Sequence, residues 1–197
     1  MPASVRTLTL ADAALPRADF FRNALLVVGA SLVTAVAARI AIPLPWTPVP
    51  VTGQTFAVLL TGMVLGSRRG ALALALYLAE GAVGLPVFAG GAAGPAALLG
   101  PTGGYLLAFP LGAAVTGMLA SRGWDRRALT TLAAMLIGSG VIFACGLAWL
   151  ARFVPAGQLL GAGLLPFLPG DVVKAALAAL AFPYAWSWIN RRSGIDA

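Results

Sequence analysis

The chain has 197 residues, of which 60% are hydrophobic and 10% are charged, and its mean hydropathy is +0.92. Because a soluble domain carries about 25% charged residues, this composition excludes a soluble globular protein and indicates an integral membrane protein. Histidine is absent, which removes the commonest general base and the commonest transition-metal ligand. The single cysteine, Cys145, excludes an intramolecular disulfide and a cysteine metal cluster. The net charge of +7 comes from arginines between apolar runs, which points to membrane topology and not to nucleic-acid binding.

The apolar runs predict an all-α integral membrane protein, a compact bundle of six transmembrane helices, since about 20 apolar residues cross a bilayer. The expected spans are residues 23–42, 55–65, 71–85, 105–119, 128–150 and 171–189. We expect residues 1–22 to be a cytoplasmic lead, residues 23–190 a single membrane domain, and residues 191–197 a cytoplasmic tail.

Three connections are rich in glycine and proline: residues 43–54, 86–104 and 152–170. Four prolines between Pro43 and Pro50 cannot continue a helix, which predicts a structured apolar loop at the membrane surface. Residues 86–104 carry no charge, and irregular backbone near a membrane is tolerated where it lines a cavity. These connections are therefore expected to be walls of a pocket or a lid over it.

The basic residues predict the orientation in the membrane. With six spans, ten of the thirteen lie on one side, in the lead, at residues 68–69, at residues 122–127 and in the tail. The positive-inside rule then places both termini in the cytoplasm. The three glycine- and proline-rich connections fall on the opposite side of the membrane.

Polar side chains gather at that same extracytoplasmic depth. Gln54, Tyr105, Asp171 and Lys174 all lie where spans that start outside begin. Glu80 is ten residues into a span that starts inside, so at about 1.5 Å per residue it lies near or beyond the midplane. This distribution predicts a pocket that is open to the outside.

Asp171 and Lys174, the only lysine, share a helix face because they are three residues apart. Charges at membrane depth are costly and usually pair or face a binding cavity. The alternative is that Asp171 caps the helix and Lys174 extends its amine to the membrane surface. Spacing alone leaves both interpretations open.

The first expected span carries small residues at four-residue spacing: Ala30, Thr34 and Ala38, with Ser31 and Ala35 beside them. Such a stripe lets another helix approach closely. That helix is either part of the same bundle or part of a partner.

Several blocks of this sequence resemble the BioY family, the biotin-specific substrate-binding (S) components of energy-coupling-factor (ECF) transporters. The match covers about residues 25–190 in the right order. The blocks that carry it are Pro48–Thr55, Leu65–Gly70, Tyr77 with Gly84–Gly91, Gly100–Tyr105 and Pro169–Lys174.

The resemblance implies a compact six-helix fold that is not an enzyme, binds biotin with high affinity and takes it up across the cytoplasmic (inner) membrane. Biotin is then the transported ligand, with no cofactor. The implied partners are a transmembrane coupling (T) protein and cytoplasmic ATP-binding-cassette ATPases, and the small residues of the first span resemble the surface that meets the coupling protein. An S component for another vitamin and a solitary biotin carrier are the alternatives.

Biotin joins a carboxylate tail to a fused thiophane–ureido ring, so its site needs a cation or donors, an acceptor for the ureido N–H groups and apolar walls. Asp171 and Lys174 resemble the ligand-binding pair of the family, and which end of biotin each meets stays open. Gln54 is expected at the ureido group or bonded to the loop backbone, and Tyr105 and Phe88 in the walls. An ionised Glu80 would repel the carboxylate, so it is expected to be protonated, paired with Lys174 or turned away.

Catalytic alternatives have little support in the sequence. Without histidine, a serine–histidine nucleophile and the usual metal sites are not available. The chain has no Gly-x-x-x-x-Gly-Lys-Ser/Thr motif, so ATP would be hydrolysed by a partner. We therefore expect no catalytic residues and no metal site.

Overall fold

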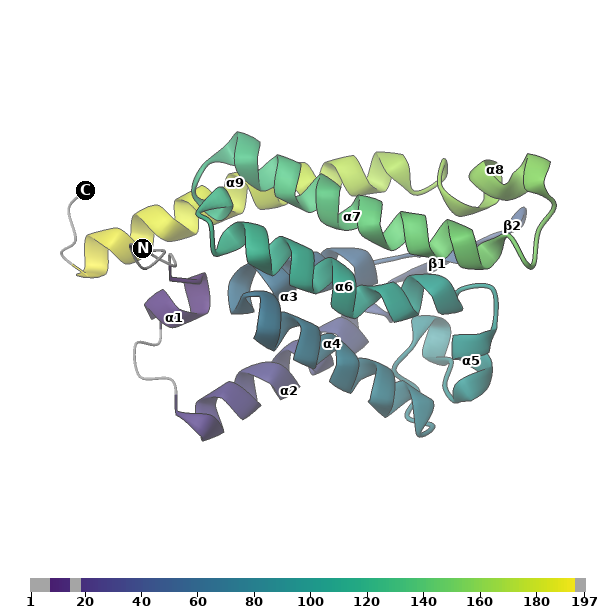
Figure 1. Cartoon of the computed structure of the whole chain (residues 1–197), viewed down its shortest axis with the longest axis horizontal. Coiled ribbons are helices and arrows are strands. Elements are labelled where there is room, and N and C mark those ends of the chain that lie inside the picture. The colour runs from purple at the N-terminus through teal and green to yellow at the C-terminus, as the bar shows by residue number, and fades with distance from the viewer. Residues whose placement is uncertain (1–7, 15–18, 194–197) are drawn as a thin grey trace, which may run out of the picture.

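A computed structural model describes residues 8–14 and 19–193 of the chain, which are mainly helical (Figure 1). The helices are α1 (Leu10–Ala14), α2 (Phe20–Ala37), α3 (Gln54–Leu65), α4 (Ser67–Ala82), α5 (Pro95–Leu99), α6 (Gly103–Ala120), α7 (Ala128–Leu150), α8 (Leu159–Gly163) and α9 (Leu168–Ser193). Short 3-10 turns lie between them: η1 (Ala89–Gly91), η2 (Trp124–Arg126) and η3 (Ala156–Gln158). The strands are β1 (Ala41–Leu44) and β2 (Thr47–Thr52).

Helix α6 lies at the centre of the bundle and packs against α3, α4 and α7 (Figure 1). Glycines permit these close contacts. A Cβ atom at Gly117 would lie 2.4 Å from the carbonyl carbon of Gly66, and one at Gly62 would lie 2.2 Å from the carbonyl oxygen of Ala113. Such distances exclude any side chain, so the glycines set the spacing of α6 from the α3–α4 pair.

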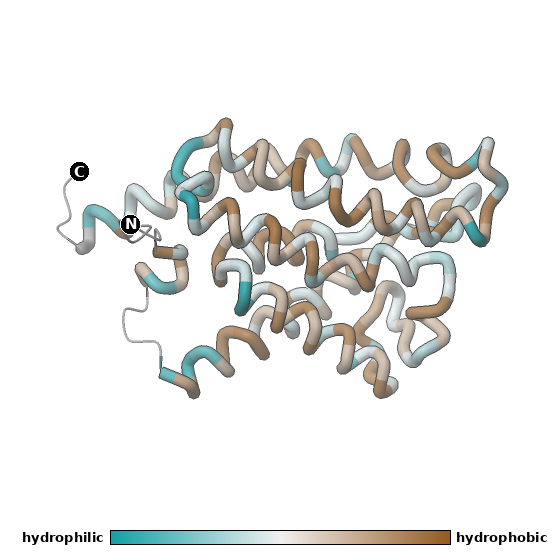
Figure 2. The backbone as a smooth tube through the Cα atoms, viewed as in Figure 1, coloured by the Kyte–Doolittle hydropathy of each residue, from teal (hydrophilic) through white to brown (hydrophobic). Residues whose placement is uncertain are grey.

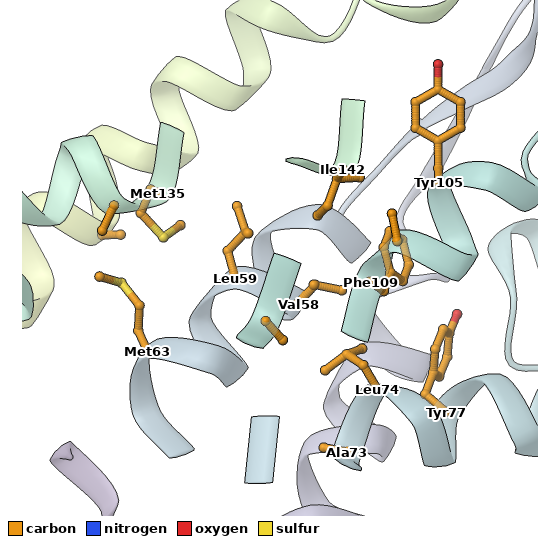
Figure 3. Close-up of a cluster of buried hydrophobic side chains, with 14 of the residues drawn as sticks. Val58, Leu59, Met63, Ala73, Leu74, Tyr77, Tyr105, Phe109, Met135 and Ile142 are labelled. Atoms are coloured by element: carbon orange, nitrogen blue, oxygen red, sulfur yellow. The ribbon is translucent and has the colours of Figure 1, made fainter. Parts of the chain in front are cut away.

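The buried core runs between these four helices (Figure 3). Its fully buried side chains include Val58 and Met63 of α3, Leu74 of α4, and Met135 and Ile142 of α7. Figure 3 shows that the tyrosines at one end of this cluster project their hydroxyl groups away from the aliphatic side chains. The core is therefore apolar in its middle and polar at one end.

The segment expected to be a loop forms an antiparallel hairpin, with Ala41 opposite Thr52 and Ile42 opposite Val51. Prolines are tolerated here because both strands of a two-stranded hairpin are edge strands. The Thr47 hydroxyl donates a hydrogen bond of 2.6 Å to the carbonyl oxygen of Ala162, which attaches the hairpin to α8. This hairpin replaces the expected loop in a chain that is otherwise helical.

Four helical segments of the described part are long and apolar enough to cross a membrane: Phe20–Ala37, Gly103–Ala120, Ala128–Leu150 and Ala156–Arg191. Helices α3 and α4, with 12 and 16 residues, are shorter. A multi-pass helical membrane protein is confirmed, and the count of six spans stays a prediction. The first span begins at Phe20 and not at residue 23. Residues 1–7, 15–18 and 194–197 of the expected lead and tail lie outside the described residues.

The two ends of the molecule differ in structure (Figures 1 and 2). The hairpin, α5 and α8 lie at one end, while α1 and the last turns of α9 lie at the other. At the α1 end, the indole of Trp186 donates a hydrogen bond of 2.7 Å to the carboxylate of Asp125, and the guanidinium of Arg126 lies 4.4 Å from the Trp186 ring centre. Burial raises the pKa of Asp125, which is fully enclosed between η2 and α9.

Candidate functional site

A cavity of about 260 Å³ lies at the hairpin end of the bundle, between β2, α3, α6, α7 and α9. The walls of the cavity are predominantly apolar, and a few hydroxyl, amide and charged side chains also line it. The lining residues are Pro48, Val49, Pro50, Val51, Thr52, Gln54, Thr55, Phe88, Ala89, Ala92, Ala97, Thr102, Tyr105, Leu106, Phe109, Phe143, Phe167, Asp171 and Lys174. Apolar walls with a few convergent polar groups are typical of small-molecule sites.

Asp171 lies inside the first turn of α9, because the helix begins at Leu168 and the Asp171 N–H already bonds to the Phe167 carbonyl oxygen. One carboxylate oxygen lies 4.0 Å from the Lys174 amine. The other is buried and has no hydrogen-bond partner within the described residues. Asp171 is therefore a member of the cavity wall with an oxygen available to a ligand, and not a helix cap.

Lys174 lies at the cavity instead of extending its amine toward the membrane surface. Its Nζ donates hydrogen bonds of 2.9 Å to the Thr52 carbonyl oxygen and 3.1 Å to the Thr55 hydroxyl, and its side chain is only 22% exposed. The amine thus connects α9 to the hairpin and to the first turn of α3. It places a cation beside Asp171 and next to the cavity.

Gln54 is 3% exposed and lies at the start of α3. Its side-chain amide donates to the Tyr77 hydroxyl at 2.6 Å, and that hydroxyl donates to the Val87 carbonyl oxygen at 2.8 Å. Gln54 therefore lines the cavity while its amide nitrogen is bonded to a side chain of α4. The expected alternative, a side-chain bond to the loop backbone, is not what the structure shows.

The aromatic walls form two groups of rings, and Figure 3 shows Tyr105, Phe109 and Tyr77 along one side of the core. The Tyr77 ring contacts the Phe88 ring edge-on, with 5.5 Å between the ring centres, and stacks on the Phe109 ring, with 6.4 Å between the ring centres. Tyr105 contacts Phe143 edge-on at 6.4 Å, and its hydroxyl donates to the Gly163 carbonyl oxygen at 2.8 Å. These contacts hold the rings in place before any ligand arrives.

Glu80 is not among the residues that line this cavity, and its role in binding a ligand stays a prediction. It lies on the side of α4 that packs against α2, where the Ser31 hydroxyl donates a hydrogen bond to its carboxylate. Of the three outcomes expected for this carboxylate, the structure shows the third, in which it is turned away.

The small residues of α2 are mostly enclosed by the chain itself. Ser31, Thr34 and Ala38 are fully buried, while Ala30 and Ala35 are half-buried. Packing within the bundle accounts for the first three, which a partner cannot reach in this structure. The exposed side of α2 consists instead of larger apolar residues, among them Leu25, Val28, Leu32 and Val36.

Most lining residues were not identified from the sequence as candidates, among them Thr55, Phe143 and Phe167. Thr55 and Phe167 lie within or directly beside the blocks that carry the family resemblance, which is a usable signal. Phe143 lies in the middle of an apolar helix, where nothing in the local sequence separates it from a core residue.

Comparisons with known proteins identify biotin transporters among the relatives of this chain. The chain is 45% identical over 147 residues to a "Probable biotin transporter BioY" of Pyrococcus horikoshii, covering 75% of this chain and 85% of that protein. It is 43% identical over 140 residues to the "Biotin transporter BioY" of Thermotoga maritima, covering 71% of this chain and 82% of that protein.

A solved structure has the same fold. It is a crystal structure of "the S-component for biotin from an ECF-type ABC transporter", with a TM-score of 0.71 and 24% identity over 90% of this chain and 93% of that one. Residues 7–191 match the BioY family over nearly the whole length described here. The chain therefore belongs to the BioY family.

Proposed function

We propose that this protein is a biotin transporter, and not an enzyme, and that it acts as the substrate-binding component of an ECF-type system. The observation that carries the proposal is a carboxylate with a free, buried oxygen beside a fixed lysine in an aromatic cavity. The BioY relatives at 45% and 43% identity support biotin as the ligand.

The charge of Asp171 favours one orientation of biotin. A ureido group presents N–H donors and a carbonyl acceptor side by side, which matches an acid and an amine 4.0 Å apart. The valeryl carboxylate of biotin would instead be repelled by Asp171. In the proposed complex, Asp171 accepts from a ureido N–H, Lys174 donates to the ureido oxygen, and the rings of Tyr105 and Phe88 contact the bicycle.

Isothermal titration calorimetry on the purified chain tests both the ligand and its orientation. Biotin and biotin methyl ester are expected to bind with similar affinity, since the ester keeps the ureido ring and loses only the charge. Thiamine and riboflavin, as members of the vitamin panel, are expected not to bind. If folded protein that is free of co-purified biotin fails to bind biotin, the proposal is wrong and the other-vitamin alternative takes its place.

The proposed topology has six spans with residues 1–22 and 191–197 in the cytoplasm. Its support is the packing of α4 and of the apolar helix α3 on α6, together with the clustering of arginines between the spans. Single cysteines introduced in a Cys145→Ala background test it. A membrane-impermeant maleimide should label Trp46→Cys in intact cells and Arg127→Cys only after permeabilisation, and the reverse pattern would invert the topology.

Energy for uptake is proposed to come from a transmembrane coupling protein and cytoplasmic ATPases in the cytoplasmic membrane, because this sequence has no phosphate-binding loop for ATP. Uptake of labelled biotin by cells that express the chain with and without such a module tests this. Equal uptake in both strains, abolished by an uncoupler, would favour a solitary ion-coupled carrier.

A further inference from the structure

A second, larger hollow lies at the opposite end of the molecule from the candidate site. It is an open groove of about 1630 Å³ between α1, α2, α4 and the end of α6. Its apolar lining comprises Leu8, Phe20, Ala24, Val27, Leu65, Leu72, Ala75, Leu76, Ala79 and Met118. Its polar lining comprises Thr9, Asp12, Asn23, Ser67, Arg68, Arg69, Ser121 and Arg122. None of these residues lines the biotin cavity.

Two exposed arginines line the groove. Arg68 and Arg122 are exposed and form no hydrogen bond or ion pair with any residue that the structure describes. Arg69 differs, because it bonds to Asp12 at 2.7 Å and to the Leu65 carbonyl oxygen at 2.9 Å. The groove therefore presents two uncompensated positive charges.

Glycine packing brings together the two segments that carry these arginines. Gly117 near the end of α6 lies so close to Gly66 and Ser67 that a Cβ atom there would approach their backbone to 2.4 Å. Arg68 follows this contact on α4, Arg122 follows it beyond the end of α6, and both line the groove. The two positive charges therefore belong to neighbouring segments of one groove.

The apolar part of the groove extends away from the arginines along the helices. On α4 the polar lining residues are 67–69, and the next lining residues, Leu72, Ala75, Leu76 and Ala79, are all apolar. On α6 the apolar Met118 precedes the polar residues 121–122. Positive charge at one end and hydrocarbon along the rest match a single amphiphile with an anionic head.

We propose that this groove binds an anionic phospholipid, with its phosphate at Arg68 and Arg122 and an acyl chain between α2 and α4. Charge complementarity selects the head group, since a zwitterionic lipid offers the two arginines no net negative charge. Apolar contacts with Leu72, Leu76 and Met118 hold the chain. The groove shares no lining residue with the candidate biotin cavity.

Native mass spectrometry of the full-length protein, titrated with phosphatidylglycerol or phosphatidylcholine of identical chains, tests the proposal. Phosphatidylglycerol should bind more tightly, and Arg68→Gln and Arg122→Gln should each weaken it about fivefold. Arg127→Gln, which removes an exposed arginine outside the groove, is the matched control and should leave binding unchanged. Ala75→Trp fills the groove and should weaken binding, whereas Ala176→Trp on the exposed side of α9 should not.

Three results would overturn the proposal. Equal binding of the two lipids, unaffected by the arginine variants, would reduce the arginines to ordinary surface charges. Competition by soluble glycerol phosphate at the same concentration as the lipid would indicate an anion site without a chain channel. Unchanged lipid binding with weakened capture of a coupling protein by Arg68→Gln and Arg122→Gln would make the groove a protein-docking surface. Biotin titration of each variant is a separate readout and shows that it is folded.

Discussion

Replacement of Lys174 by methionine is the most informative single change in this protein. Methionine has a similar volume and fills the same space, but it removes the hydrogen bonds to the Thr52 carbonyl and the Thr55 hydroxyl. Charge-assisted hydrogen bonds contribute about 1.5–3 kcal/mol each. The change also leaves Asp171, which is 6% exposed, without its nearby cation. Loss of one partner of a buried ion pair costs about 3–5 kcal/mol.

Two quantities should change in Lys174→Met. The free energy of unfolding should fall by about 2–4 kcal/mol, below the sum of these terms because the Lys174 side chain is 22% exposed. Biotin affinity should fall about 10- to 150-fold, the equivalent of one charge-assisted hydrogen bond. Calorimetry in detergent measures the affinity, and circular dichroism during chemical denaturation measures the stability.

A double-mutant cycle with Asp171→Asn separates the pair from its surroundings. The asparagine no longer needs a cation, so the double variant should recover about 1–2 kcal/mol of the stability that Lys174→Met alone loses. Val173→Met is the matched control, since Val173 lies on the exposed side of the same helix, and it should alter neither quantity. If Lys174→Met binds biotin within about threefold of the parent, the proposed role of this lysine is refuted.

Two further predictions concern packing and pH. Gly146→Ala places a Cβ atom 2.2 Å from the Tyr105 ring, so it should lower the free energy of unfolding by about 1–3 kcal/mol and weaken biotin binding. Gly140→Ala is the control, because its Cβ atom meets nothing within 4 Å, and it should change neither quantity. Equal melting temperatures for the two variants would contradict this reasoning. Asp125 has a pKa raised by burial, so its neutral form stabilises the fold, and that contribution is complete below the unfolded pKa and lost as pH rises through the folded one. The melting temperature should therefore fall less steeply between about pH 4 and pH 8 in Asp125→Asn than in the parent protein. The asparagine amide oxygen can still accept the hydrogen bond from the Trp186 indole. Parallel curves for the two proteins would show that another group titrates.

The sequence predicted the depth of polar residues better than the direction they face. Five of the predicted residues line one cavity, because each lies at or near a helix end or in a loop at the hairpin end of the bundle. They are Gln54, Phe88, Tyr105, Asp171 and Lys174. Their roles in binding a ligand stay predictions. For the acid–lysine pair, spacing of three residues on one helix already defines a common face.

Glu80 shows where this reasoning fails. Its position along α4 gives its depth, but the rotation of α4 depends on which helices pack against it. Ser31 of α2, 49 positions earlier in the chain, supplies the hydroxyl that bonds to its carboxylate. No local pattern around Glu80 contains that information.

The small residues of the first span and the proline-rich hairpin also depend on contacts that the local sequence does not specify. Small side chains predict that another segment approaches closely, but not which one, and Ser31, Thr34 and Ala38 are buried within this chain. Four prolines exclude a helix correctly, but they do not exclude an isolated two-stranded hairpin, in which each strand has an unpaired edge.

The bonds of Lys174 to the hairpin and to α3 also constrain how the protein is made. The cavity joins β2, near residue 50, to α9, more than 110 residues later in the chain. A nascent chain that has already inserted α2 through α7 still lacks one wall and both charges of the site. In the proposed complex, ligand binding thus needs the last helix, so a chain terminated before α9 is expected not to sequester biotin.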